Sequence, residues 1–301
     1  MSVELDYFEV ATDAGMQAAY VTNGIYDSNF LTGGTATADE YYDASTAPSK
    51  AFDGSMSTYW QVYPTTGTHW IKYDLGAGVT KIASKMTTQS TYNQLNAFTI
   101  QGSTDNTNWD LLYSGNGANN DTLQTFTFSN SKAHRYYLIT ITSQYTSGNL
   151  NVYEIQMMEL CLQSYSESTI KTQGSYSLKA IASTSSLNKT LTRTVSPTID
   201  LTGQTKWKFD MRASRTGSNV KVGIHDSGGT TTETTPNIAS ADTFQTVEVD
   251  ISGVSNANKD AIDSIIFTQV NADSATTYYV DNFFAYIPSV SSWIPQIYVI
   301  S

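Results

Sequence analysis

The feature that most constrains this chain is a run of alternating residues at positions 69–76, His-Trp-Ile-Lys-Tyr-Asp-Leu-Gly. One set consists of Ile71, Tyr73 and Leu75, and the other of Trp70, Lys72 and Asp74. Successive side chains of a strand point to opposite faces, so this period of two predicts a strand with one buried face.

The same alternation recurs through most of the chain. It is found at Phe98/Ile100, Phe126/Phe128, Tyr153/Ile155/Met157, Trp207/Phe209/Met211, Val220/Val222/Ile224, Val247/Val249/Ile251 and 278–286. Turn-forming Gly, Asn, Ser and Asp separate these runs, and helical periodicity is almost absent. With 301 residues the chain is long enough for two cores. We therefore predict an all-β protein of two jelly-roll β-sandwich domains.

Five motifs in order resemble the F5/8 type C, or discoidin, module. They are Ala51–Gly54 with Trp60, residues 69–76, Asn96–Ser103 running to Trp109, Arg135–Leu138, and Asn151–Ile155. The resemblance implies an eight-stranded jelly roll over residues 24–160. It also implies a binding function, because members of that family mostly bind sugars or lipid head groups without catalysing a reaction.

A second resemblance lies in Gln173–Leu178 and Tyr278–Asn282, which are similar to parts of a jelly-roll carbohydrate-binding module. Such a module opens with a strand that carries an acidic residue, and Leu5–Val10 with Glu9 fits that description. We therefore expect residues 1–23 and 161–287 to form one discontinuous domain, with the discoidin-like module inserted in its first loop. The alternative is an N-terminal linker followed by two sandwiches in series.

Composition excludes several classes of function. The net charge of −11, without any basic run, argues against a nucleic-acid partner. The single cysteine, Cys161, excludes an intramolecular disulfide. No apolar stretch approaches the roughly 20 residues of a membrane helix, so membrane insertion is not expected. The first residues have neither the basic region nor the apolar run of a secretory signal peptide.

Motifs for catalysis are missing as well. The three histidines show no zinc-protease spacing, and there is no nucleophile elbow, P-loop or dinucleotide fingerprint. Paired carboxylates for glycoside cleavage remain open on spacing alone. We predict that the protein is not an enzyme.

The resemblance to discoidin-like sugar binders implies a structural Ca²⁺ site. Its ligands would be Asp53 of the Asp-Gly turn, Thr58, and Glu154 of the last strand. The alternative is an Asx-turn at Asp53 and a surface carboxylate at Glu154.

The resemblance of the second domain to a carbohydrate-binding module implies a second structural Ca²⁺, at Glu9 and Asp281 with backbone carbonyls near Lys171 and Ser175. Asp281 interrupts an apolar strand, where an unpaired carboxylate would be costly to bury. The alternative places Asp281 at a strand end, capping a turn in water.

Sugar rings stack on flat aromatic faces, while polar groups hydrogen-bond the hydroxyls. The candidate ligand-binding residues occur in polar loop contexts and are Tyr41, Tyr42, Tyr63, His69, Tyr92 and Tyr145.

The C-terminal residues 288–301 are too apolar for a free tail, with Trp293, Ile294 and Ile297 among them. We expect them to dock on another copy of the chain or, in a virus particle, on other virion proteins.

The predicted function is non-catalytic carbohydrate binding or adhesion to glycans. The predicted location is extracellular or on a virion, for example as a bacteriophage tail or decoration protein. Two alternatives remain open: a purely structural spacer, and an accessory binding fragment of a polysaccharide-degrading enzyme.

Overall fold

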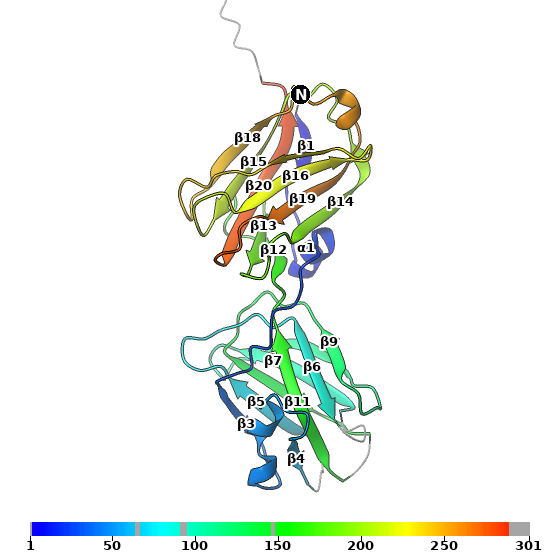
Figure 1. The fold of residues 1–301 in the computed structure, drawn as a ribbon, viewed down its shortest axis with the longest axis vertical. Coiled ribbons are helices and arrows are strands. Elements are labelled where there is room, and N and C mark those ends of the chain that lie inside the picture. The colour runs from blue at the N-terminus through cyan, green and yellow to red at the C-terminus, as the bar shows by residue number, and fades with distance from the viewer. Residues whose placement is uncertain (1, 64–66, 91–94, 146–147, 289–301) are drawn as a thin grey trace, which may run out of the picture. The chain divides into compact units, whose positions relative to one another are not determined.

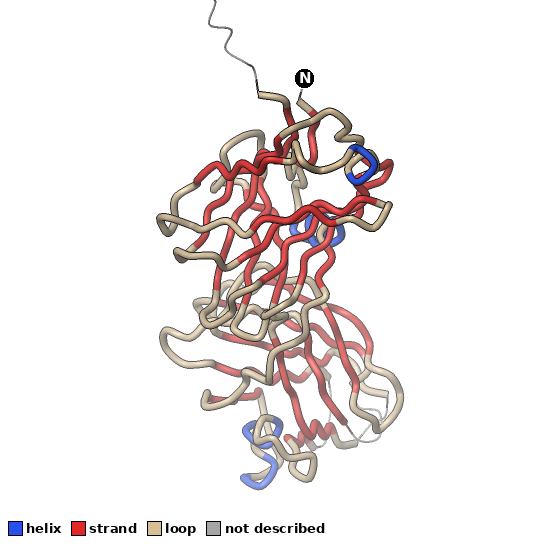
Figure 2. The backbone as a smooth tube through the Cα atoms, turned by 45° about the horizontal axis from the view of Figure 1, so that its top comes forward, coloured by secondary structure: helices blue, strands red, loops and turns tan. Residues whose placement is uncertain are grey.

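The computed structural model describes residues 2–63, 67–90, 95–145 and 148–288, and strands dominate it (Figures 1 and 2). The predicted all-β fold is confirmed. The helices found there are short: α1 Asp13–Ala19 and the 3₁₀ turns η1 Ala44–Thr46, η2 Pro48–Ala51 and η3 Asn256–Asn258. No helix in those ranges is long and apolar enough to cross a membrane. The apolar residues of the expected docking tail, 289–301, lie outside the described residues.

The chain divides into two compact units. The continuous unit contains residues 24–161, and the discontinuous unit joins residues 1–23 to residues 162–301.

Two sheets enclose the core of the continuous unit. One has the order β3 (Thr35–Ala38), β5 (His69–Asp74), β10 (Tyr136–Ile141), β7 (Ala97–Ser103) and β8 (Asp110–Asn116). The other has the order β4 (Trp60–Val62), β11 (Leu150–Met158), β6 (Lys85–Ser90) and β9 (Gln124–Thr127). Ile71, Ile100 and Ile139 of the first sheet meet Trp60 and Ile155 of the second in a single apolar cluster. The predicted burial of the Ile71 face is therefore confirmed.

The discontinuous unit is also built of two sheets. One runs β12 (Leu162–Glu167), β13 (Ser177–Ala182), β20 (Thr276–Tyr286), β15 (Lys206–Ala213) and β18 (Gln245–Asp250), with β1 (Val3–Asp6) paired to β20. The other runs β17 (Thr231–Thr234), β16 (Val220–Asp226), β19 (Ile262–Gln269), β14 (Thr190–Ile199) and β2 (Val21–Thr22).

The N-terminal segment supplies both a strand and core side chains to this unit. β1 pairs antiparallel with β20 (Figure 1), and β2 pairs with β14. Phe8, Met16 and Tyr20 are buried, and the rings of Phe8 and Tyr20 stack with centroids 5.7 Å apart. Burial of three such side chains contributes several kcal/mol to the stability of the unit that they join.

The first strand differs from the expected Leu5–Val10, because it ends at Asp6. The Asp6 carboxylate accepts a hydrogen bond from the Phe8 backbone N–H at 2.7 Å, and Phe8 takes a left-handed φ of 60°. This turn buries the Phe8 ring and leaves Glu9 beyond the strand.

We expect a protein of residues 24–161 alone to melt cooperatively, because its core draws on no residue outside that range. A protein of residues 162–288 should fail to fold, because it lacks β1, Phe8, Met16 and Tyr20. Circular dichroism and thermal melting measure both outcomes. Joining residue 23 to residue 162 through a short Gly-Ser linker should restore folding of the discontinuous unit. A native-like melt of residues 162–288 alone would contradict the shared core.

Candidate functional site

Glu154 lies on β11 and is hydrogen-bonded to the loop that carries Gly54. The register of β11 against β6 shifts between Val152 and Glu154, which breaks the alternation of the strand. As a result Glu154 and Ile155 are both buried, with Glu154 only 1% exposed. The alternative of a surface carboxylate at Glu154 is therefore wrong.

Asp53 and Thr58 lie in the loop that Glu154 faces. The Gly54 backbone N–H donates to Glu154 Oε2 at 3.2 Å, and the Thr58 hydroxyl lies 2.8 Å from both Asp53 oxygens. The Ser55 N–H also donates to Asp53 Oδ1 at 3.1 Å, which is an Asx-turn. The structure thus brings together the three residues predicted for the first calcium site.

The buried Glu154 carboxylate is only partly compensated by hydrogen bonds. Its Oε1 is buried and has no hydrogen-bond partner among the described residues. Burial, with a smaller contribution from the nearby Asp53 carboxylate, raises the pKa of Glu154 to about 7, although hydrogen bonds from the Gly54 backbone and the Gln156 side chain act to lower it. A proton or a cation would remove this cost.

The donor set fits Ca²⁺. Asp53 and Glu154 supply carboxylate oxygens and Thr58 a hydroxyl, all hard ligands of the kind that calcium prefers. The unpartnered Glu154 Oε1 is the observation that favours a bound cation here, because hydrogen bonds already account for Asp53 and Thr58.

The Asp281 carboxylate of the discontinuous unit is compensated differently. It is 0% exposed within β20, so the alternative of a solvated strand end is wrong. Its Oδ2 accepts from the backbone N–H groups of Thr172 and Gln173 at 2.6 and 3.0 Å. The Ser175 N–H donates to Glu9 at 2.8 Å, and a Cβ at Gly174, where φ is +56°, would collide with the Glu9 carboxylate. One loop therefore ties both acids through N–H donors, and calcium at Glu9 and Asp281 stays a prediction.

Asp210 is a further acid at this point that the sequence analysis did not single out. It lies directly opposite Asp281 in the β15–β20 register, and it is 9% exposed. The Thr172 hydroxyl lies within hydrogen-bonding distance of both carboxylates, and Thr246 and Asn282 donate to Asp210. Like charges placed opposite each other repel, so Asp210 increases the demand for a positive group or for these donors.

Tyr42 and Tyr63 are brought together at the surface of the continuous unit. Their side chains are 58% and 55% exposed, and the rings meet edge to face with centroids 5.9 Å apart. With Gln61 and Asn149 they line an open pocket of about 460 Å³. The Tyr42 N–H donates to the Gln61 carbonyl at 2.9 Å, which fixes one side of the pocket to β4.

The other predicted ligand-binding residues have different settings. Tyr41 lines a separate pocket of about 310 Å³ with Ala38 and Pro48. The Tyr145 hydroxyl donates to the Gly117 carbonyl at 2.9 Å, and Tyr92 lies outside the described residues.

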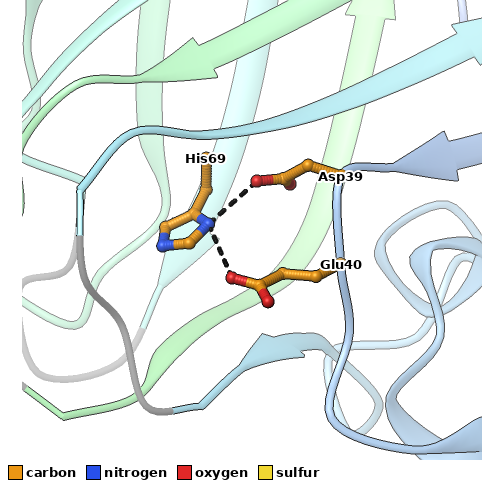
Figure 3. Close-up of side chains that lie close together, drawn as sticks. All are labelled: Asp39, Glu40 and His69. Atoms are coloured by element: carbon orange, nitrogen blue, oxygen red, sulfur yellow. Dashed lines mark hydrogen bonds and ion pairs between the residues drawn. The ribbon is translucent and has the colours of Figure 1, made fainter.

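His69 is only 2% exposed, because it falls on the same face of β5 as Ile71. Its Nδ1 lies between the carboxylates of Asp39 and Glu40 (Figure 3). A buried ring offers little surface for a sugar to contact. The burial of His69 therefore does not support a direct ligand role, which stays a prediction.

Comparison with known proteins bears on the continuous unit. Residues 35–155 match the F5/8 type C domain. The resemblance read from the five motifs is confirmed for this segment. No curated protein matches the chain.

Several solved structures are similar. Chitosan-binding module 1 derived from chitosanase/glucanase from Paenibacillus sp. IK-5 is 25% identical, with a TM-score of 0.39, over 43% of this chain and 97% of that one. The family 32 CBM from C. perfringens NanJ, solved in complex with galactose, is 19% identical, with a TM-score of 0.40, over 45% of this chain and 100% of that one. CpGH89CBM32-5 from Clostridium perfringens, in complex with GalNAc-beta-1,3-galactose, is 17% identical, with a TM-score of 0.40, over 44% and 100%.

We expect the calcium-free protein to lose stability as the pH rises from about 4.5 to about 7. In that window the unfolded chain has released the Glu154 proton while the folded chain still holds it, so deprotonation favours unfolding. The free energy of unfolding should fall by up to roughly 3 kcal/mol from this group. Thermal melts in excess chelator measure the effect. Glu154→Gln should remove this component, and an unchanged pH profile in that variant would contradict the assignment.

Chelation should lower the melting temperature if calcium is bound. A concentration of 100 times Kd stabilises the folded state by about 2.7 kcal/mol, roughly 5–10 °C for units of this size. Calorimetry of the wild type, Glu154→Gln and Asp281→Asn separates the two sites. The calcium-dependent shift of the continuous unit should vanish in Glu154→Gln, and that of the discontinuous unit in Asp281→Asn. If neither chelator nor added calcium changes the melting temperature of the wild type, both sites are ruled out.

Proposed function

We propose that this protein is a non-catalytic carbohydrate-binding protein whose F5/8 type C domain binds glycans at the pocket between Tyr42 and Tyr63. The observation that carries the proposal is this pair of exposed, mutually contacting rings beside two amide side chains. The family match of residues 35–155 supports a binding role, and the lack of any catalytic motif in the sequence supports the absence of catalysis.

The chemistry of the pocket suits a neutral sugar. Tyrosine rings present flat apolar faces to the C–H side of a sugar ring, and their hydroxyls remain available for hydrogen bonds. Gln61 and Asn149 add amide groups that can both donate to and accept from sugar hydroxyls. The pocket lining in the described residues carries no charged side chain, which favours a neutral ligand over an anionic one.

Calcium would contribute by ordering the loop beside the pocket rather than by taking part in a reaction. The loop that carries Asp53 and Thr58 leads directly into β4, which presents Gln61 and ends just before Tyr63. A cation between Asp53 and Glu154 would anchor this loop to β11 and limit the movement of the strand that supports the pocket. Binding would then cost less conformational entropy.

A site of two rings and a few neutral hydrogen bonds binds weakly, so useful adhesion requires many copies. This need for copies motivates the bacteriophage tail or decoration role, the extracellular or virion location and the association through residues 288–301. Those assignments remain predictions. The structural alternative, in which both units act as spacers without a ligand, and the accessory-fragment alternative remain the competing proposals.

We expect Tyr42→Ala and Tyr63→Ala each to reduce glycan binding about fivefold, because each removes a stacking face worth about 1 kcal/mol. A glycan array probed with the protein displayed multivalently identifies the ligand, and calorimetry with the best sugar measures each variant.

Tyr145→Ala is the matched control, because it deletes an exposed tyrosine of the same unit that does not line the pocket. It should bind as the wild type does. Equal losses in all three variants would move the site elsewhere, and no binding to any displayed glycan would favour the spacer.

A further inference from the structure

Each of the three histidines of this chain lies against an aspartate. His134 Nε2 is 2.9 Å from Asp110, and His225 Nδ1 is 2.7 Å from Asp263. His69 differs from both, because its Nδ1 faces two carboxylates at once: Asp39 Oδ2 at 3.0 Å and Glu40 Oε1 at 3.2 Å. Among the described residues, His69, Asp39 and Glu40 form the one group of three or more His, Cys, Asp or Glu side chains that lie close enough to hold a metal ion.

The charge around His69 is not balanced. At His134 the same fold places Lys132 on Asp110, so that the carboxylate is paired with a cation. At His69 a second carboxylate stands where a cation would be expected, and the ion pairs described for Asp39 and Glu40 involve His69 alone. A single imidazole proton cannot offset two carboxylates, whereas a divalent cation with a neutral imidazole can.

Hydrogen bonds from the surroundings hold the Asp39 carboxylate and the backbone of Glu40. The Trp70 backbone N–H donates to Asp39 Oδ1 at 3.1 Å, which leaves Oδ2 directed at the histidine. The Trp60 indole N–H donates to the Glu40 carbonyl at 2.9 Å and fixes the backbone at that residue. In Figure 3 Nδ1 points at both acids while Nε2 points away, and Nε2 has no hydrogen-bond partner among the residues described. The carboxylates therefore set the orientation of the ring.

We propose that His69 Nδ1, Asp39 Oδ2 and Glu40 Oε1 bind a divalent first-row transition ion, with Zn²⁺ as the representative. Two ligand atoms that each lie about 2.0–2.1 Å from a tetrahedral ion are about 3.3 Å apart. The two nitrogen–oxygen distances here, 3.0 and 3.2 Å, are close to that value, and all three donor atoms lie within 4.8 Å of one another. The side chains of Asp39 and Glu40 are 23% and 56% exposed, which gives the ion a path from solvent and room for a water ligand.

The donor set separates this site from the calcium site at Asp53 and Glu154. An imidazole nitrogen suits Zn²⁺ and its neighbours in the first transition row, whereas Ca²⁺ takes oxygen ligands. The two sites should therefore fill independently, each with its own ion. The proposal does not depend on the glycan function, since it concerns the ion alone.

Calorimetric titration of the full chain with ZnCl₂, in saturating Ca²⁺, tests the site. We expect one Zn²⁺ per chain in the wild type. Glu40→Gln and Asp39→Asn should each weaken Zn²⁺ binding at least tenfold. Glu40 is half exposed, so its variant should fold normally, and an unchanged circular dichroism spectrum checks this. Co²⁺ gives a second measurement, because nitrogen–oxygen coordination produces visible absorption bands that should fade in the same variants.

Asp110→Asn is the matched control, because it removes a carboxylate from the His134 pair of the same unit. It should bind Zn²⁺ as the wild type does, and so should Glu154→Gln. The proposal is overturned if the wild type binds no Zn²⁺, if Glu40→Gln binds it unchanged, or if Asp110→Asn loses as much affinity as Glu40→Gln.

Discussion

Burial of carboxylates inside apolar sheets is the constraint on which the functional features of this protein depend. Four register shifts, next to Asp6, Glu154, Asp210 and Asp226, coincide with acids that are buried. A bulge changes which face the following side chains occupy, so residues beside it depart from the simple alternation of the strand. Each buried charge then requires a partner, because the free energy of burying it alone exceeds what packing returns.

The partners differ, and the differences separate structural acids from candidate sites. Asp6 contacts Tyr20 and Arg193, so a protein cation neutralises it. Asp281 accepts two backbone N–H groups of one loop. Glu154 accepts hydrogen bonds from the Gly54 backbone and the Gln156 side chain, and its Oε1 has no hydrogen-bond partner among the described residues. A supplied ion is therefore most strongly favoured at Glu154, and the case for calcium is weaker at Asp281, where hydrogen bonds already do part of the compensation.

Strand periodicity made most of the fold predictable, and bulges set the limit of that approach. The alternation at residues 69–76 identified β5 and its buried face, and the same parity places His69 beside Ile71 in the core. The alternation in the sequence therefore indicates a buried His69, although its place among polar loop residues predicts a ligand-binding role like that of the tyrosines. Asp210 was not predictable in the same way, because its parity with Lys208 puts it on the face away from the core, and it is buried there by contacts with Thr172, Thr246 and Asn282 that the sequence does not reveal.

The site residues show a similar division. Asp53, Thr58 and Glu154 were named from motifs, and the structure brings them together because Gly54 is hydrogen-bonded to Glu154 across 100 positions of sequence. The tyrosines were named from loop context alone. Tyr42 and Tyr63 meet because the Tyr42 N–H is tied to Gln61 of β4, whereas Tyr145 is held by the Gly117 loop. Context indicates that a ring is exposed, but only the pairing of strands determines which exposed rings share a pocket.

The strand pairing also accounts for the second candidate ion. Asp39 follows directly on β3, and its backbone N–H donates to the Trp70 carbonyl of β5, so the acids at the end of β3 lie beside the first residue of β5. That residue is a histidine on the buried face, and the two acids that reach it come from the exposed end of the neighbouring strand. A nitrogen donor held by the core and oxygen donors open to solvent thus meet at one edge of the sheet. This combination favours a transition ion over calcium, and it arises from the same antiparallel register that builds the core.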